Sequence, residues 1–148
     1  MNARSELPSG LPRSVAEGED LARFLTQKNH FSREKHLVKP AAFIPTADGE
    51  TSVFRHGSEP RDALWQIGRD QIEARGRQLI GAGIVRARHA TDAGLGVDPD
   101  EPPPRHAVVR GWPDRGGDAA ERRAQQLERA KLVAQHAELL LVLGADDP

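Results

Sequence analysis

Proline and glycine divide this chain of 148 residues into segments that can form only short helices and strands. It has 11 prolines and 14 glycines. Lys39 precedes a proline, which disfavours helix there, and Pro102–Pro104 forces an extended segment. Between such breaks, helical and strand-like patterns follow one another. We therefore predict an α+β fold, in which a small, mostly antiparallel sheet packs against two or three helices, with a long C-terminal helix.

The composition indicates one domain and excludes several kinds of chemistry. Apolar residues make up 37% of the chain before glycine is counted, and the formal net charge is −1. Because cysteine is absent, disulfides, thiolate nucleophiles and iron–sulfur clusters are excluded. Residues 1–13 lack periodicity and are predicted to be a flexible arm, with residues 14–148 forming the domain. Neither a signal peptide nor a membrane span is visible, so we expect a cytoplasmic protein.

Local patterns predict where the helices and strands lie. Ser14 and Glu17 have the spacing of a capping box before an apolar stripe, which indicates a helix over 15–28. The Asp48-Gly49 pair indicates the turn of a β-hairpin. The other predicted elements are helices over 60–75 and 118–142, and strands over 41–45, 51–56, 80–90 and 106–110.

Two arginine-histidine pairs are candidates for acid–base chemistry. His56 and His106 each follow an arginine. Imidazole transfers protons near neutral pH, and a guanidinium stabilises an anion. One hypothesis is therefore a small metal-independent nuclease or nucleotide hydrolase in which these two histidines act as acid and base. The phosphate would be held by Arg55 or Arg105.

Two further patterns are too unspecific to define a site. Asp98, Asp100 and Glu101 offer carboxylate oxygens, but the further residues of a nuclease metal motif are missing. Arg129 and His136 match a spacing found in HEPN-type ribonucleases, which an arginine-rich helix meets by chance. We therefore predict no metal site and no cofactor.

A basic segment before Pro40 is the best candidate for nucleic-acid contact. Cationic side chains there could grip phosphates, with Phe31 available to stack on a base. Glu34 interrupts the segment. The predicted nucleic-acid-binding residues are His30, Arg33, Lys35, His36 and Lys39.

The end of the predicted C-terminal helix is apolar almost all round. One face of a helix cannot bury so many leucines, so this helix either crosses the core or offers a surface to a second protein. We predict a protein partner or self-association there. The predicted partner-binding residues are Leu139, Leu140, Leu141, Leu143 and Trp112.

Four sequence blocks occur in a distinctive order over residues 30–113, namely VKPAAFIP, TSVFRHG, ALWQIG and GLGVDPDEPPPRHAVVRGWP. This order resembles that in a group of small bacterial proteins. The resemblance implies a bacterial, cytosolic, single-domain protein. It implies no activity and no site residue.

Three functional hypotheses follow from the sequence. The first is an accessory or binding module of a bacterial multi-component system, which contacts a protein partner and nucleic acid but no membrane. The second is the small hydrolase described above. The third is a structural subunit without a ligand.

Overall fold

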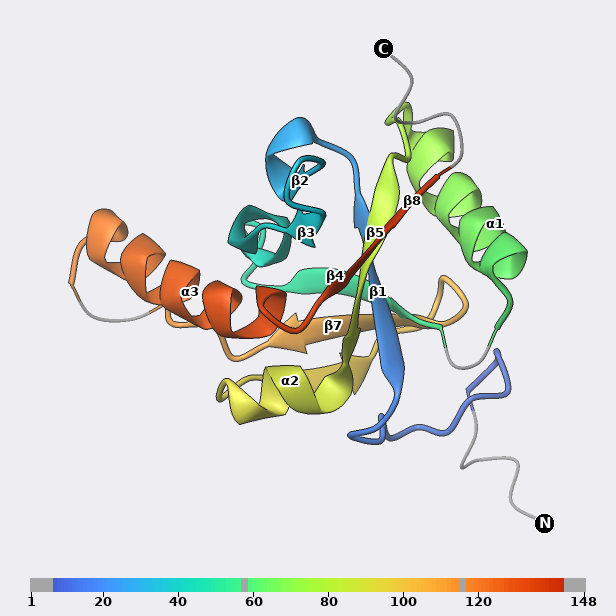
Figure 1. Cartoon of the computed structure of the whole chain (residues 1–148). Coiled ribbons are helices and arrows are strands. Elements are labelled where there is room, and N and C mark those ends of the chain that lie inside the picture. Colours follow the sequence, from blue (N-terminus) through green and yellow to red (C-terminus); the bar gives the residue numbers. More distant parts are fainter. Residues whose placement is uncertain (1–6, 57–58, 115–116, 143–148) are drawn as a thin grey trace.

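An antiparallel sheet of six strands organises the chain. The computed structural model describes residues 7–56, 59–114 and 117–142. The strand order is β6-β7-β4-β1-β5-β8 (Figure 1). Its strands are β1 (Asp20–Leu25), β4 (Thr51–Arg55), β5 (Gly81–Arg86), β6 (Gly96–Pro99), β7 (His106–Arg110) and β8 (Glu138–Leu141). The helices are α1 (Arg61–Ile72), α2 (Ala87–Asp92) and α3 (Ala119–Ala134), and β2 (Phe31–Ser32) pairs with β3 (Leu37–Val38) in a small separate hairpin. The prediction of an α+β fold is confirmed.

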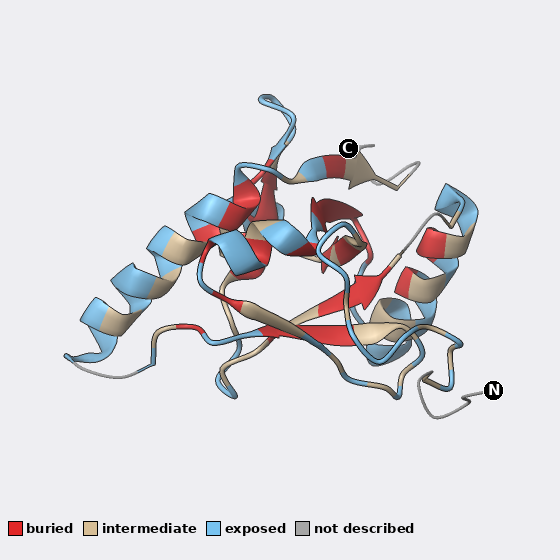
Figure 2. Ribbon diagram, turned by 90° about the horizontal axis from the view of Figure 1, so that it is seen from below, coloured by how far each residue is buried: buried red, intermediate tan, exposed pale blue. Residues whose placement is uncertain are grey.

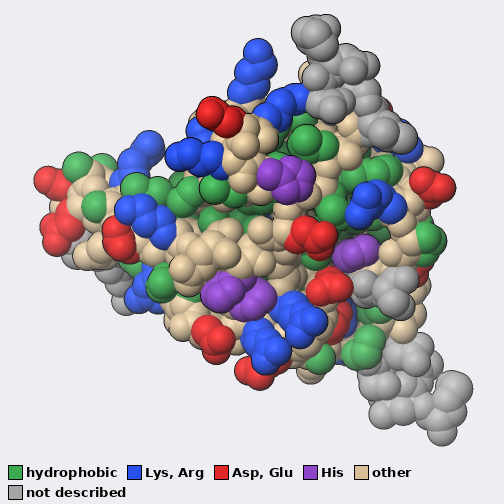
Figure 3. All heavy atoms as spheres, in the orientation of Figure 1, with side chains coloured by type: hydrophobic (Ala, Val, Ile, Leu, Met, Phe, Trp, Pro, Cys, Tyr) green, Lys and Arg blue, Asp and Glu red, His purple; other side chains and the backbone are tan. Residues whose placement is uncertain are grey.

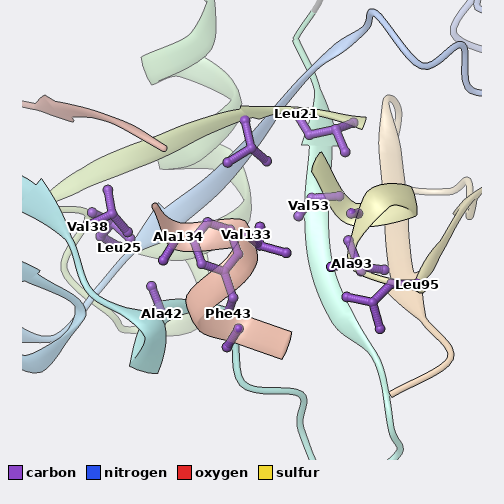
Figure 4. Close-up of a cluster of buried hydrophobic side chains, with 14 of the residues drawn as sticks. Leu21, Leu25, Val38, Ala42, Phe43, Val53, Ala93, Leu95, Val133 and Ala134 are labelled. Atoms are coloured by element: carbon purple, nitrogen blue, oxygen red, sulfur yellow. The ribbon is translucent and has the colours of Figure 1, made fainter. Parts of the chain in front are cut away.

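Different helices cover the two faces of the sheet. Leu64 and Trp65 of α1 pack on one face, against Phe24 and other strand residues. The larger cluster lies on the other face and includes residues of α2, α3 and the segment around Phe43 (Figure 4). Figure 2 shows buried residues along the strands and exposed ones on the outer sides of the helices. Each face of the sheet is therefore part of a separate apolar core.

The helix predicted over 15–28 is wrong, because β1 occupies this part of the chain. Leu21 pairs with Arg55 of β4 on one side and with Val85 of β5 on the other. Neighbouring residues Leu21 and Ala22 are both fully buried. A central strand covered on both faces loses the alternation that identifies a half-exposed strand. Its leucines and phenylalanine therefore fall by chance at helical spacing.

Of the predicted hairpin around Asp48-Gly49, the turn and the second strand are confirmed, and the first strand is wrong. The turn forms, with Gly49 at φ 83° and its N–H donating to the Thr46 carbonyl at 2.9 Å. β4 follows as predicted. The segment predicted as a strand over 41–45 instead contains a 3-10 helix, η3 (Pro40–Phe43), which begins at its proline and buries its last two residues.

The helix predicted over 60–75 is confirmed. α1 is continued by a 3-10 turn, η4 (Glu73–Arg75), and ends at Gly76 with φ 79°. Ser58, a typical N-cap residue type just before this helix, lies outside the described residues. The strand predicted over 80–90 is right only as far as Arg86, because the next residues form α2 and bury Ala87 and Ala90 at helical spacing.

The C-terminal helix starts as predicted but ends early. Asp118 caps α3 by accepting the Glu121 N–H at 2.8 Å. The helix ends at Ala134 rather than near residue 142, and the leucines after it form β8. Leu139 packs into the core that contains α3, and Leu140 packs toward the core that contains α1. The predicted extension of the helix to residue 142 is therefore wrong. A strand whose leucines alternate between two cores has the same run of apolar residues in its sequence as a helix that is apolar on every side.

The first described residues lie against the domain. Ser9 Oγ donates to Glu101 Oε2 at 2.6 Å, and the carbonyl of Pro12 accepts from Arg55 Nη1 at 2.6 Å. These bonds join part of the predicted arm, residues 7–13, to two distant segments. In the described part of the chain, no helix combines the length and apolar character needed to cross a membrane.

Candidate active site

Ser52 and His106 meet on the face of the sheet that carries α1. Ser52 lies on β4 opposite Val108, and His106 lies on β7 opposite Phe54. The two residues are therefore diagonal neighbours across an antiparallel pair, within reach of a long side chain. Ser52 Oγ is 2.6 Å from His106 Nε2.

The hydrogen-bond partner of Nδ1, the second ring nitrogen of His106, determines which of the two nitrogens carries the proton. Nδ1 is 2.8 Å from the main-chain carbonyl oxygen of Asp100, which can only accept a hydrogen bond. In the neutral ring Nδ1 is therefore the protonated nitrogen, and Nε2 offers its lone pair to the Ser52 hydroxyl. Oδ2 of the Asp100 carboxylate is 3.3 Å from the same Nδ1. The three side chains thus have the arrangement of a nucleophile, a general base and an orienting carboxylate.

Packing and a short loop hold the His106 ring in place. The Phe54 ring lies 5.2 Å from it, centroid to centroid, and only 13% of the His106 side chain is exposed. The Asp100 N–H donates to the His106 carbonyl at 2.9 Å, and the His106 N–H donates to the Pro103 carbonyl at 3.1 Å. The loop between β6 and β7 therefore returns Asp100 to the imidazole through main-chain bonds.

Arg23 holds the backbone of β4 at Ser52. Its Nη1 donates to the Ser52 carbonyl at 3.0 Å and its Nε donates to the Ala42 carbonyl at 2.6 Å. Burial, and the nearby charge of Arg77, lower the pKa of Arg23 to about 10, so its guanidinium is still cationic at neutral pH. The carbonyl of Ser52 is therefore held by a charged donor.

A cavity of about 260 Å³ opens beside Ser52 and His106. Gln71 and Arg75, from the end of α1 and from η4, line it with hydrogen-bond donors. Carboxylates outnumber the arginine in its lining. The bond from the Thr46 hydroxyl lowers the pKa of Asp48, which keeps that carboxylate ionised. The acidic residues of the lining are Asp48, Glu50 and Asp100.

The structure does not bring the two arginine-histidine pairs into one site. His106 lines the cavity just described, whereas His56 lines a separate one at the start of α1. Arg55 is completely buried and bonds Glu19 at 2.9 and 2.8 Å. Arg105 donates to a second glutamate at 2.6 Å. Both guanidinium groups therefore have structural partners within the chain.

The predicted nucleic-acid-binding residues divide into buried and exposed members. His30 is buried, its Nδ1 accepts the Thr26 N–H at 3.3 Å, and burial followed by the charge of Arg23 lowers its pKa to about 4. Phe31 is buried as well and lies under the Arg33 guanidinium, 5.6 Å from the ring centroid. The exposed members, on and beside the β2–β3 hairpin, are Arg33, Lys35, His36 and Lys39.

The predicted partner-binding residues do not form an exposed helical face. Leu139 is buried, and Leu140 and Leu141 are half-buried in β8. Trp112 is buried, with its indole N–H donating to the Val109 carbonyl at 3.1 Å. Leu143 lies outside the described residues. β8 is the outermost strand on its side of the sheet, so a protein partner here would meet a strand edge.

The three acidic residues considered as metal ligands, Asp98, Asp100 and Glu101, each have their own partners within the chain. Asp98 Oδ2 lies 3.2 Å from Arg110 Nε, while Asp100 and Glu101 bond the partners described above. Among residues 7–56, 59–114 and 117–142, no three histidine, aspartate or glutamate side chains form a metal-ligand group. Arg129 donates to the Ala93 carbonyl at 2.7 Å and so is used in packing α3 against the end of α2.

Sequence reasoning misses Ser52 and the role of Asp100. Alternation along β4 does place Ser52, Phe54 and His56 on one face. It cannot reveal that β7 pairs with β4 in the register that brings His106 beside Ser52. The signal available was an Asp-to-His spacing of six residues across a proline-rich loop, which only the fold converts into a contact.

No protein-family model, curated protein or solved structure matches the chain. The functional assignment therefore rests on geometry and chemistry.

Proposed function

We propose that this protein is a hydrolase in which Ser52 is the nucleophile, His106 the general base and Asp100 the orienting carboxylate. The observation that carries the proposal is the 2.6 Å contact from Ser52 Oγ to His106 Nε2. A second observation supports it: Nδ1 of His106 must donate to the main-chain carbonyl of Asp100, which leaves Nε2 free to accept the serine proton. A serine hydroxyl is a weak nucleophile until a neighbouring base accepts its proton, and this geometry supplies that base.

The proposed reaction proceeds in two steps. Ser52 Oγ attacks the acyl carbon while its proton passes to His106 Nε2, and the leaving group departs with that proton. Water then attacks the acyl–serine ester with His106 again accepting a proton, which returns to Ser52 Oγ as the acid leaves. The imidazolium formed in each step is stabilised by the Asp100 carboxylate, 3.3 Å from Nδ1.

Gln71 and Arg75 are the donors available to the oxyanion. Ser52 lies within a central strand, where neighbouring main-chain N–H groups are engaged in the sheet. The side-chain amide of Gln71 and the guanidinium of Arg75 line the same cavity. Donors aimed at a developing negative charge are a major source of rate acceleration.

The cavity favours small neutral or cationic acyl substrates. Its volume of about 260 Å³ suits a short acyl group. Its carboxylates, Asp48 and Glu50 among them, repel polyanions. This substrate class differs from the nucleotide substrates expected from sequence, because the arginines meant to hold a phosphate are paired elsewhere.

The test is covalent labelling followed by turnover. We expect a fluorophosphonate probe to add to Ser52, as located by peptide mass spectrometry, and a p-nitrophenyl acyl ester to be hydrolysed. Ser52→Ala removes labelling and hydrolysis, and His106→Gln lowers both by roughly a thousandfold or more. Ser32→Ala, at a serine outside the cavity, is the matched control and leaves both unchanged.

Retained hydrolysis in folded Ser52→Ala would overturn the proposal, as would equal labelling of several serines. Thermal unfolding of each variant separates loss of chemistry from loss of fold. Ser52→Cys gives a second measurement, because a thiol on the same carbon keeps a nucleophile beside His106 and is expected to retain covalent labelling.

The basic hairpin supports a second function, as the nucleic-acid contact of a binding module. Four cationic or histidine side chains are exposed on or beside a projection of only two short strands (Figure 1). Such a group binds phosphates without reading sequence, so its affinity falls steeply with salt. The buried Phe31 does not offer a stacking face, which restricts this contact to the nucleic-acid backbone.

Fluorescence anisotropy with a labelled single-stranded RNA at two salt concentrations tests this function. We expect the double variant Lys35→Gln, Lys39→Gln to bind the RNA more weakly. The slope of log affinity against log salt concentration should become shallower by roughly one to two units, because fewer counterions are released. Arg69→Gln, an exposed change on α1, is the control. Binding that is equally strong in the double variant would contradict it.

A further inference from the structure

A second cavity lies at the other end of the same sheet face, between the start of α1 and the region around α2 and β8. Its volume is about 650 Å³ and it shares no lining residue with the cavity beside Ser52. Figure 3 shows histidine, acidic and basic side chains gathered over this part of the molecule. Its lining combines apolar side chains of α1, β5 and β8 with charged and histidine side chains, among them Asp20, His56, Arg61, Arg86, His136 and Glu138.

Strand register places several of these polar groups in one row. Asp20 at the start of β1 pairs with Arg86 at the end of β5. On the other side of Asp20, the His56 N–H donates to its carbonyl at 3.0 Å. A row across three adjacent strands is rigid, because each backbone is fixed by its neighbours.

His56 has a buried nitrogen without a partner. Its Nδ1 is shielded from solvent and makes no hydrogen bond to any described residue. Buried polar atoms are nearly always satisfied, and leaving one unpaired destabilises a fold. Because the His56 side chain also lines the cavity, a ligand there can supply the missing partner once the ring turns toward it.

Two stacked histidines form another part of the cavity wall. The rings of His89 and His136 lie 4.2 Å apart and 7° from parallel. His89 Nδ1 accepts the Arg86 N–H at 3.2 Å, so the neutral ring carries its proton on Nε2 and is a donor there. Burial is the main cause that lowers the pKa of His89. The nearby charges of His136, Arg88 and Arg86 lower it further, whereas the charge of Asp92 raises it.

Arg61 and Arg86 have no ion-pair partner among the described residues. They come from different elements, α1 and β5, and both line the cavity. Glu59, an acidic residue of the same lining, is already paired with Arg105 at 2.6 Å. Two guanidinium groups that lack an ion pair among the described residues suit a phosphate, which has two charges and three outer oxygens, whereas one fork satisfies a carboxylate.

We infer that this cavity binds a small phosphate monoester of about nucleotide size, with Arg61 and Arg86 on the phosphate. The hydroxyl or amino groups of the same ligand bond the carboxylates of Asp20 and Glu138, which also line the cavity. The His56 ring, which lines the cavity, turns on binding so that Nδ1 gains its missing hydrogen bond from the ligand. This site is independent of the hydrolase proposal, because the two cavities share no residue.

Titration of the full chain with AMP, followed by the imidazole signals in NMR spectra, tests this inference. We expect saturable shifts of His56, His89 and His136 at millimolar AMP or below, and no shift with adenosine. Arg61→Gln and Arg86→Gln each weaken binding by roughly tenfold. Arg69→Gln, exposed on α1 outside the cavity, is the control and binds normally.

A second variant separates binding from folding. His56→Leu removes the unpaired nitrogen, so it is expected to raise the midpoint of thermal unfolding while it lowers affinity for AMP. The inference is wrong if AMP shifts none of the three histidines, if adenosine shifts them equally, or if folded Arg61→Gln and Arg86→Gln bind as tightly as the parent.

Discussion

Ser52 and His106 are 54 residues apart in the sequence, yet Oγ of the first and Nε2 of the second lie 2.6 Å apart. The contact depends on the pairing of β4 with β7, which sets Phe54 opposite His106. Both residues are on strands, and the third group, Asp100, lies on the loop that leads into β7. Two paired strands and a loop held by main-chain bonds therefore fix the relative positions of Ser52, His106 and Asp100.

Asp100→Asn is expected to reduce hydrolysis only moderately, by roughly ten- to a hundredfold. In the Ser-His-Asp enzymes the same change costs about ten-thousandfold, because the asparagine selects the wrong imidazole tautomer. Here the main-chain carbonyl of Asp100 continues to accept from Nδ1, so the tautomer is retained and only the carboxylate charge is lost. Steady-state kinetics with an acyl ester measure the effect. A loss as large as that of Ser52→Ala would show that the carbonyl does not orient the ring.

Arg55→Met is expected to destabilise the fold by roughly 3–5 kcal/mol. Arg55 is completely buried, bonds Glu19 through two nitrogens and also donates to the carbonyls of Pro12 and Ser14. Burial alone would raise the pKa of Glu19, but the bonds from Arg55 and from the Ala16 N–H, with the Arg55 charge, hold it below its usual value. Urea denaturation measures the change.

Arg110→Met is the matched control for that experiment. Arg110 is about half exposed and its ion pairs with Glu50 and Asp98 lie in solvent. Its loss is expected to cost about 1 kcal/mol or less. Equal effects of the two substitutions would show that the Arg55 network adds nothing beyond a surface ion pair.

Stability is expected to fall as the pH drops below 6.5, in part through His30. The folded pKa of His30 is about 4 and the unfolded value is 6.5, so the unfolded chain binds the proton first. Across that window the stability contributed at neutral pH, up to about 3 kcal/mol, is lost. Urea denaturation from neutral pH down to about 4 measures it. His30→Gln should flatten this dependence, whereas the exposed His36→Gln should not; equal curves for both would contradict the assignment.

Gly81→Ala is expected to disrupt the pairing of β5 with β8. A Cβ at this position would collide with the main-chain carbonyl of Leu140, which belongs to the paired strand and cannot rotate away. We expect a loss of roughly 2 kcal/mol or more, seen as a lower unfolding midpoint. Gly96→Ala, where the nearest atom is a side-chain carbon of Arg110 at 3.9 Å, is the control and should be nearly neutral.

Elements with a clear start or stop signal could be predicted from the sequence. Gly76 ends α1, Asp118 begins α3, and Gly49 forms its turn as expected. These signals act within a few residues, so no tertiary information is needed to interpret them.

The errors concern strands that contact two cores. β1 and β8 are apolar on both sides, so their sequences match a buried helix as well as a strand. The same limit applies to the candidate active site. His106 could be singled out as an acid–base group, but Ser52 is an ordinary strand residue until β7 is placed beside it.

The central position of β1 also determines the order in which the sheet can be built. Both of its partners, β4 and β5, come later in the chain. During synthesis β1 therefore leaves the ribosome as an apolar segment with nothing to pair with, and non-local pairing of this kind is slow. Until β5 has been made, at least one edge of β1 stays unpaired, and chaperones or neighbouring copies can bind that edge.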